Sequence, residues 1–550
     1  MADVSKYISE WQKSKDFVAG YTRDFRDLDT IANAQYPRGS GKKPNVGDTT
    51  IAGTIRQQMR RAVKQLPVIG MAINGSKQTK EAYMARFIVN DRILNPISFG
   101  KGFVNILRLG GRGAISRGFN AFQVKATKLY GEYGVQPALL HFSDLGIEPG
   151  VQDANLSGYS YVKTQYTPNK LKKIYDREKK NPRTTWNVKA LKALMEIGPD
   201  GTGETEYAEW LIPSQQNTVP DGAETYTIVT RYCSDIDEDI ISFSPSLTQE
   251  LRTVPNRSKF GYPRVLFLVI DPAELSAFGD SRVRLASPNQ NLMMALRQNV
   301  VATWLYNSDP TVVKTGMFAG ATALRSGGVM TTTDPNAKVN LLTLDTTTAQ
   351  QYPNISKEIK GQILDMLGYN PSANLGAIGE SKTGVGAQTQ RMTMDESSQE
   401  ITHIIEEFIK QYILSAFDLY VSQQDGEDVL YVDDETKKDI EAVAPGLFTD
   451  PDNPNALAIN WNEYYAFIKK IDVTVETTMS KDEYTDQKRA TLQDALTVMK
   501  QTQDPNDPAA KAKSDVVEDE FLKEAAPDIS QRISAAEQNA PTPVQAPPMM

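Results

Sequence analysis

The clearest pattern of hydrophobic positions lies between residues 287 and 424, where it predicts two amphipathic helices. The first is expected to open at Ser287-Pro288, because serine is a favoured N-cap and proline suits the first helical position. Apolar residues then recur every three or four positions and predict one packing face: Met293, Leu296, Val300 and Trp304. The turn-forming run at 307–310 is expected to end this helix.

The second helix is longer and is predicted over residues 389–424. One face carries its apolar residues, which are Ile401, Ile404, Ile405, Phe408, Tyr412 and Ile413. Charged residues such as Glu406, Glu407 and Lys410 fall elsewhere around the helix. We expect the apolar face to be buried against the rest of the protein.

A glycine-rich segment at 375–387 lies between these two helices and is predicted to form a loop. Its glycines, among them Gly379, Gly384 and Gly386, disfavour a helix, and its one lysine is Lys382. Two rigid helices with such a loop between them favour a mechanical role over a catalytic pocket.

Elsewhere the chain predicts more helices than strands. Thr167 is the expected N-cap of a basic helix that begins at Pro168 and runs through Lys180. The other predicted helical regions are 1–65 with a loop at 36–44, 76–135 with glycine-rich turns near 110–113, 186–195, 482–500 and 511–538. The proline-rich end, 540–550, is not expected to fold.

The predicted strands include a β-hairpin formed by 225–233 and 241–244. Its turn carries four acidic residues, which are Asp235, Asp237, Glu238 and Asp239. Further strands are expected at 262–270, 338–344 and 471–476. The acidic turn is read as a solvated turn, with divalent-metal binding as the less favoured alternative.

No motif for catalysis stands out. Neither Gly39–Lys43 nor Gly379–Thr383 has the spacing of a phosphate-binding loop, so the chain is not expected to be an ATPase. The two histidines, His141 and His403, lack the partners that a metal site requires. One cysteine, Cys233, excludes a disulfide within the chain. We therefore expect no enzyme activity and no cofactor.

Composition adds few constraints. The chain has 550 residues, of which 40% are hydrophobic and 23% charged, as in a soluble globular protein. Its longest apolar run, 265–270, cannot cross a bilayer, and its polar start predicts no secretory signal. A net charge of −8 is unusual for a protein that grips nucleic acid, but it suits a conduit through which DNA slides. The alternative is that the charge only aids solubility.

The order of these segments resembles that of the portal proteins, or head-to-tail connectors, of tailed phages, with the short-tailed branch as the nearest. The resemblance rests first on 279–284, Gln290, Gln298-Asn299 and Asp309-Pro310. It also rests on Thr383-Gly384 and Thr389–Arg391, which are similar to the family's tunnel loop and tunnel-facing helix. Segments 90–96 and 140–149 stand where portal wings carry similar ones. The likeness covers roughly residues 50 to 490.

This resemblance implies an α+β subunit, predominantly α-helical, with wing, stem, β-rich clip, tunnel loop and helical crown. The implied order of its parts is 1–185 wing, 186–224 first stem helix, 225–278 clip, 279–307 second stem helix, 308–370 wing, 371–388 tunnel loop, 389–424 tunnel-facing helix, 425–479 wing, 480–538 crown and 539–550 tail.

It also implies a homo-oligomeric ring, of twelve copies in the family, at one capsid vertex in the virion after assembly in the host cytoplasm. Double-stranded DNA would pass through the ring, near Gly379, Lys382, Gly384, Gly386 and Arg391. The implied partners are the terminase large subunit, a tail adaptor, and the major capsid and scaffolding proteins, with no membrane. In a clip, the acidic turn would meet a basic partner.

Two other functions remain open at this stage. The chain fits another virion component of the tail or capsid, with its helices serving subunit contacts, or less well a carboxylate-dependent nuclease. Arg282, Arg284 and Arg297 flank the first predicted helix and could contact the capsid shell, a neighbouring subunit or DNA.

Overall fold

The computed structural model describes residues 4–33, 49–63, 66–94, 102–129, 132–181, 184–202, 224–273, 276–308, 311–315, 335–336, 338–342, 347–368, 384–448 and 450–476. The chain divides into two units, Met1–Val475 and Glu476–Met550. Beyond Glu476 the second unit lies outside the described residues, and so do the predicted crown, the tail and the loop at 36–44.

Within the described residues the fold mixes helices with several sheets, which agrees with the predicted α+β class. The helices are α1 (Ser5–Tyr21), α2 (Phe25–Asn33), α3 (Thr50–Ala62), α4 (Lys80–Ile88), η1 (Val89–Leu94), α5 (Gly102–Arg117), η2 (Phe142–Asp144), η3 (Ala154–Leu156), α6 (Pro168–Glu178), α7 (Val188–Ile197), α8 (Arg282–Ser308), α9 (Thr347–Met366), α10 (Gly384–Ser422), α11 (Asp434–Val443) and α12 (Trp461–Phe467). The strands are β1 (Val68–Ile73), β2 (Phe119–Leu129), β3 (Glu132–Leu140), β4 (Leu145–Ile147), β5 (Tyr159–Tyr166), β6 (Gly201–Thr202), β7 (Glu224–Cys233), β8 (Ile240–Phe243), β9 (Glu250–Val254), β10 (Val265–Val269), β11 (Thr311–Thr315), β12 (Lys338–Leu342), β13 (Glu427–Tyr431), β14 (Ala456–Asn460) and β15 (Ile471–Glu476).

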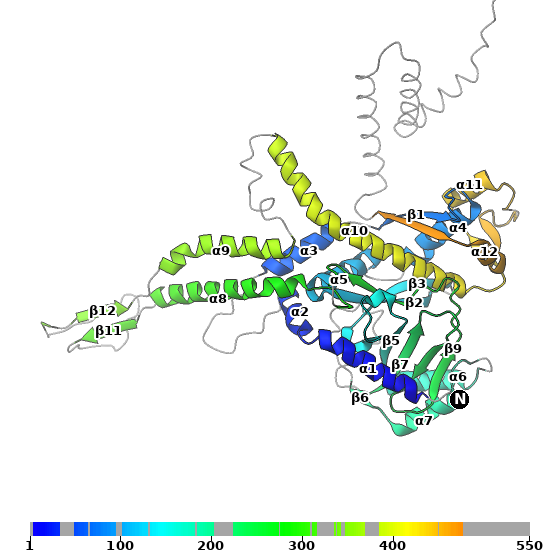
Figure 1. The fold of residues 1–550 in the computed structure, drawn as a ribbon, viewed down its shortest axis with the longest axis horizontal. Coiled ribbons are helices and arrows are strands. Elements are labelled where there is room, and N and C mark those ends of the chain that lie inside the picture. Colours follow the sequence, from blue (N-terminus) through cyan, green and yellow to red (C-terminus); the bar gives the residue numbers. More distant parts are fainter. Residues whose placement is uncertain are drawn as a thin grey trace, which may run out of the picture. The chain divides into compact units, whose positions relative to one another are not determined.

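The largest sheet is antiparallel, in the order β4-β5-β7-β8-β9, with β6 also paired to β7. Successive residues of β7 face opposite sides of this sheet. Ile228 packs with Leu171 and Leu191 from α6 and α7, whereas Val229 packs with Trp11 of α1 in a separate cluster. The sheet is therefore covered by helices on both faces (Figure 1).

A second sheet, in the order β10-β2-β3, lies in the main hydrophobic core with α5 and α10. Val265 of β10 is opposite Gln123 of β2, so strands far apart in sequence are paired. The ring of Phe408 on α10 lies 4.7 Å from that of Phe122 on β2, centroid to centroid. The long helix therefore packs across this sheet, as its apolar pattern predicts.

In the part of the chain that the structure describes, three two-stranded sheets complete the topology: β1-β15, β11-β12 and β13-β14. The first two-stranded sheet joins residues near the start of the chain to the end of unit 1. Next to it, Arg86 of α4 forms an ion pair at 2.7 Å with Asp439 of α11. None of the helices in the described ranges is long and apolar enough to span a bilayer.

Several local predictions are confirmed. Thr167 accepts a hydrogen bond from the backbone of Lys170 and caps α6, which ends at Glu178. The predicted hairpin is formed by β7 and β8, and the strand predicted at 262–270 is β10. The range assigned to the clip nevertheless divides between two sheets, because β10 pairs with β2 and not with the hairpin.

The predicted glycine-rich turns near 110–113 are wrong, because these residues lie inside α5. A Cβ at Gly110 would strike the Phe122 ring, and one at Gly111 would strike Met59. Glycine is required here for close packing against β2 and α3, and this packing outweighs its low helix propensity. The helix expected as far as residue 135 is likewise replaced by β2 and β3 from residue 119 onward.

The packing face of α10 generates a first prediction. Phe408→Asp places a charge in the core beside Phe122, and it should lower the free energy of unfolding by at least about 3 kcal/mol in urea titrations. His403→Asp, on the exposed side of the same helix, is the matched control and should change it by less than about 1 kcal/mol. Equal losses in both variants would show that the apolar face is not buried.

His141 precedes the short helix η2, where its Nδ1 accepts a hydrogen bond at 3.2 Å from the backbone N–H of Ser143. Its ring centroid lies 4.0 Å from that of Phe142. Burial, followed by the positive charges of Arg117 and Lys163, lowers the pKa of His141 to about 3. The ring is therefore neutral in the folded protein near neutral pH.

An unfolded histidine binds a proton near pH 6.5, whereas folded His141 does so only near pH 3. Between these two pH values the unfolded state binds more protons than the folded state. The contribution of neutral His141 to the unfolding free energy is therefore complete above pH 6.5 and is lost as the pH falls. The unfolding free energy should drop by up to about 1.4 kcal/mol per pH unit below pH 6. His141→Asn should remove this slope, whereas His403→Asn should keep it. An unchanged slope in His141→Asn would contradict the assignment.

Candidate functional site

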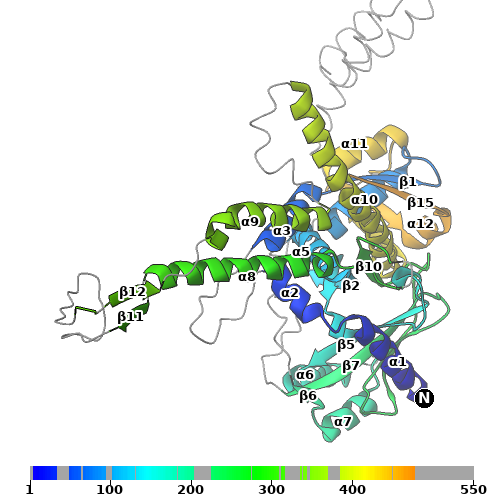
Figure 2. The same ribbon diagram turned by 60° about the vertical axis from the view of Figure 1, so that its left-hand side comes forward.

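The helices α8 and α9 form an antiparallel pair that carries the short sheet β11-β12 between them in sequence (Figures 1 and 2). Near the start of α8, Asn289 donates hydrogen bonds to Gln362 at 3.2 Å and to the sulfur of Met366 at 3.7 Å, both near the end of α9. At the other end of the pair, Thr311 of β11 is opposite Leu342 of β12. We call α8, β11, β12 and α9 together the arm.

The arm begins earlier than the sequence suggests. Helix α8 starts at Arg282, and its cap is Ser281, whose Oγ accepts a hydrogen bond from the backbone of Arg284 at 2.9 Å. The predicted start at Ser287-Pro288 is wrong, since Pro288 lies inside the helix. Proline cannot donate to the carbonyl of Arg284, and the hydroxyl of Ser287 donates to that oxygen instead, at 3.0 Å. Ser287 thus compensates for the proline.

The guanidinium of Arg282 holds the end of the arm that joins the rest of the described protein, and we call this end the root of the arm. Arg282 donates two parallel hydrogen bonds to Asp271, at 2.5 and 2.6 Å, and a third to the carbonyl of Leu367 at 3.2 Å. Its side chain also lies 3.9 Å from Glu400 of α10. Burial alone would lower the pKa of Arg282, but the hydrogen bonds to Asp271 and its charge raise it. This one residue therefore connects α8, the end of α9, α10 and the segment after β10.

Backbone geometry next to this contact requires glycine. Gly368 has φ +67, and a Cβ there would approach the guanidinium of Arg282 to 2.6 Å. The carbonyl of Leu367 also accepts a hydrogen bond at 2.9 Å from Gln58 of α3. The end of α9 is thus held from two sides, by α8 and by α3.

Arg284 makes a similar but more exposed contact. It donates two hydrogen bonds of 2.7 Å to Asp24, in the turn before α2. These bonds lower the pKa of Asp24 and raise that of Arg284. Both side chains remain about half exposed, so this pair contributes less than the Arg282 contact.

The packing of α8 is one-sided. Of its four predicted packing residues, Met293 and Val300 are buried and Leu296 is partly buried, but Trp304 is 65% exposed. The prediction for Trp304 is wrong within a single copy of the chain. Leu285 and Leu292 are also 60% and 50% exposed, and seven residues of separation place them on one side of the helix. Helix α8 therefore presents large apolar side chains that the described part of the chain does not cover.

The residues predicted to line a DNA channel fall around the start of α10. Gly384 and Gly386 lie in its first turn and Arg391 in its third, so the predicted loop ends earlier than expected. Gly379 and Lys382 lie outside the described residues. Further along α10, Ile401, Ile405, Phe408 and Tyr412 are buried and Ile404 partly buried, as predicted.

The acidic turn joins β7 to β8, and all four of its acidic side chains are exposed. Glu238 accepts hydrogen bonds from Arg231 at 2.6 Å and from the thiol of Cys233 at 3.0 Å. These two bonds, that of Cys233 first, lower the pKa of Glu238. Glu238 therefore stabilises the hairpin, and no trio of metal-ligating side chains gathers in the part of the chain that the structure describes.

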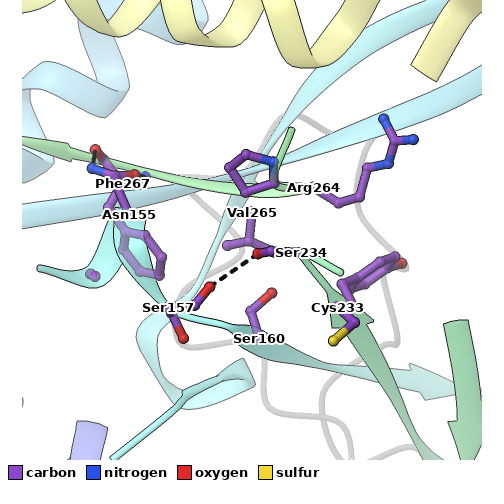
Figure 3. Close-up of a pocket in the computed structure, with 11 residues that line it drawn as sticks. Asn155, Ser157, Ser160, Cys233, Ser234, Arg264, Val265 and Phe267 are labelled. Carbon is purple, nitrogen blue, oxygen red and sulfur yellow. Dashed lines mark hydrogen bonds between the residues drawn. The ribbon is translucent and has the colours of Figure 1, made fainter. Parts of the chain in front are cut away.

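A small cavity lies where β5, β7 and β10 approach one another (Figure 3). It has room for about one water molecule. Its polar groups largely satisfy one another: Ser234 donates to the carbonyl of Ser157 at 3.0 Å, and Asn155 bonds the backbone of Phe267 through both its amide atoms. The hydrogen bonds around the cavity connect segments of the two large sheets. The cavity itself is too small for a substrate.

No protein-family model matches the sequence, and no curated protein matches it either.

The two arginines at the root of the arm provide a matched test. Arg282→Lys keeps the charge but loses the paired hydrogen bonds to Asp271, and it should lower the unfolding free energy by about 2 kcal/mol. Arg284→Lys changes the exposed pair with Asp24 and should cost less than about 1 kcal/mol. Urea titrations with equal losses for both would refute the anchoring role of Arg282.

Proposed function

We propose that this chain is the subunit of a portal, a closed homo-oligomeric ring at one capsid vertex of a tailed phage. The observation that carries the proposal is the exposure of large apolar side chains along α8, a helix of 27 residues, with Leu285 and Leu292 on one side and Trp304 near its end. Such a helix extends for about 40 Å. Large apolar side chains along a helix are typical of a surface that another subunit covers.

A second copy of the chain is the favoured occupant of this surface. The arm is anchored firmly at its root by Arg282, so its uncovered side is held in a fixed direction. A rigid head-to-tail contact between two different faces of the chain generates a ring when its rotation closes. Each buried leucine would contribute about 1.5–3 kcal/mol to the contact.

The pairing of α8 with α9 favours a different placing of the portal parts from the one that sequence order suggests. A portal clip is a small β-rich insert between two stem helices, and β11-β12 lies between α8 and α9. We therefore propose α8 and α9 as the stem and the segment between them as the clip. The sheet with the β7-β8 hairpin then belongs to the wing, and α10 follows the tunnel loop.

In this proposal the chain acts by mechanics and electrostatics. Double-stranded DNA would pass through the bore during packaging and ejection, with Lys382 and Arg391 as the proposed basic contacts. The clip would dock the terminase large subunit and later a tail adaptor, and the wing would meet the major capsid and scaffolding proteins. No bond is made or broken by the chain itself, so it is proposed as a non-enzymatic virion protein.

The assembly mass tests this proposal. Native mass spectrometry of the purified protein should give a closed oligomer of about twelve copies of the 60.9 kDa chain. Leu292→Glu should shift the population to small species, because it would bury a charge in the subunit contact.

Leu156→Glu is the control, since this leucine is 79% exposed and lies on η3, which is not part of the arm. It should assemble like the unmodified chain. A monomeric unmodified protein, or a Leu292→Glu protein that assembles normally, would contradict the proposal.

A further inference from the structure

Two neighbouring helices of this acidic chain contain arginines but no acidic residue. Helix α3 carries Arg56, Arg60 and Arg61, and α5 carries Arg108, Arg112 and Arg117. The whole chain has 68 acidic and 60 basic residues, so these two helices differ in charge from the chain as a whole. A local positive field on an otherwise acidic protein indicates a binding surface for an anion.

Close packing brings three of these arginines together. Helix α3 buries Ile51, Ile55 and Met59 and exposes Arg56 and Arg60, which are one turn apart. On α5, Gly111 leaves room for Met59, because a Cβ there would strike its side chain. The two helices can therefore approach closely, and the next residue, Arg112, lies within the electrostatic reach of Arg56 and Arg60. We call Arg56, Arg60 and Arg112 the arginine face.

These three charges are not neutralised by the described part of the chain. Arg112 donates one hydrogen bond of 3.2 Å, to the neutral amide of Asn33. Burial, and then the charges of Arg56 and Arg60, lower the pKa of Arg112, and no carboxylate of the described residues acts against them. Nor does an ion pair join any of the three to a described carboxylate.

Other arginines of the described residues are paired with carboxylates. Arg117, also on α5, lies 3.0 Å from Asp29, and Arg282 and Arg284 are paired with Asp271 and Asp24. Like charges one turn apart destabilise a helix unless a counter-ion separates them. The arginine face therefore has an electrostatic cost in the free protein that a bound anion would remove.

The chemistry of the face favours phosphate over a protein partner. Guanidinium groups bind phosphate oxygens through paired hydrogen bonds. Arg56 and Arg60 are about 6 Å apart along the helix axis, close to two nucleotide steps of one DNA strand. The exposed stripe of α3 consists of Gly53, Arg56, Gln57 and Arg60, so it lacks the apolar anchors on which protein interfaces depend.

We propose that the arginine face of α3 and α5 binds the phosphate backbone of double-stranded nucleic acid, without reading its sequence. These three arginines are not among the residues assigned above to the channel, and the inference does not require that the chain form a ring. A chain with an acidic net charge would thus contact DNA through one restricted face.

The test uses fluorescence anisotropy of a labelled DNA duplex of arbitrary sequence, titrated with the full-length protein over a range of KCl concentrations. The variant is Arg56→Gln/Arg60→Gln, whose side chains are exposed and repel each other, so its thermal midpoint should not fall. The matched control is Lys469→Gln/Lys470→Gln, which removes two exposed positive charges after α12. A labelled polyglutamate peptide is titrated in parallel.

The arginine variant should bind the duplex at least about tenfold more weakly at low salt. The slope of log affinity against log salt should fall by about 2, one for each lost phosphate contact. The lysine control should keep the slope of the unmodified protein, and polyglutamate should bind more weakly than DNA.

Three results would overturn the proposal. The unmodified protein does not bind the duplex; the arginine and lysine variants lose the same affinity; or polyglutamate binds as tightly as DNA, which would assign the face to an acidic protein segment. The assembly mass of the arginine variant is measured independently. A change in mass with an unchanged salt slope would also overturn the proposal, because it would identify a subunit contact.

Discussion

The contact of Arg282 with Asp271 and Leu367 is the constraint on which the arm depends. Helices α8 and α9 pack mainly on each other beyond their root, so their direction is set where they join the sheets. At that point one buried guanidinium satisfies a carboxylate and a helix-terminal carbonyl together. A lysine could not make both contacts with the same geometry, because it lacks the planar pair of donors. Gly368 and Gly118 leave the space that this junction needs.

Because the arm is held firmly at its root, its exposed apolar side chains stay on the surface. On a freely moving helix, Leu292 and Trp304 would be expected to fold back onto the protein. Held away from the core, they keep a surface available that a neighbouring subunit can cover. The charges are similarly divided: Arg117, Arg282 and Arg284 are paired with carboxylates, while the arginine face has no carboxylate partner among the described residues. The paired arginines thus stabilise the fold, and the three arginines of the arginine face are available to bind an anion.

Local sequence patterns predict the elements whose stability is local. The apolar stripe of α10, the cap at Thr167 and the β7-β8 hairpin all depend on residues a few positions apart, and the structure contains each of them. The failures involve particular side-chain contacts that helix propensity does not capture. Pro288 is accepted inside α8 because of Ser287, and the glycines of α5 are kept because β2 and α3 pack closely against them.

The candidate site was predictable only in part for the same reason. Arg282 and Arg284 stand out in the sequence beside the helix, but Asp24 lies 260 residues before Arg284, and no local pattern reveals that pairing. Nor does the sequence show that α9, rather than α7, is the partner of α8, because side-chain packing decides it. The arginine face, by contrast, leaves a visible signal: two neighbouring helices that contain arginine and no acidic residue.

The central claim is that copies of this chain assemble side by side through the arm. Averaged electron micrographs of the purified full-length protein test it most directly. The account predicts end-on views with rotational symmetry and a central opening. Particles the size of one chain, without symmetry or an opening, would contradict it.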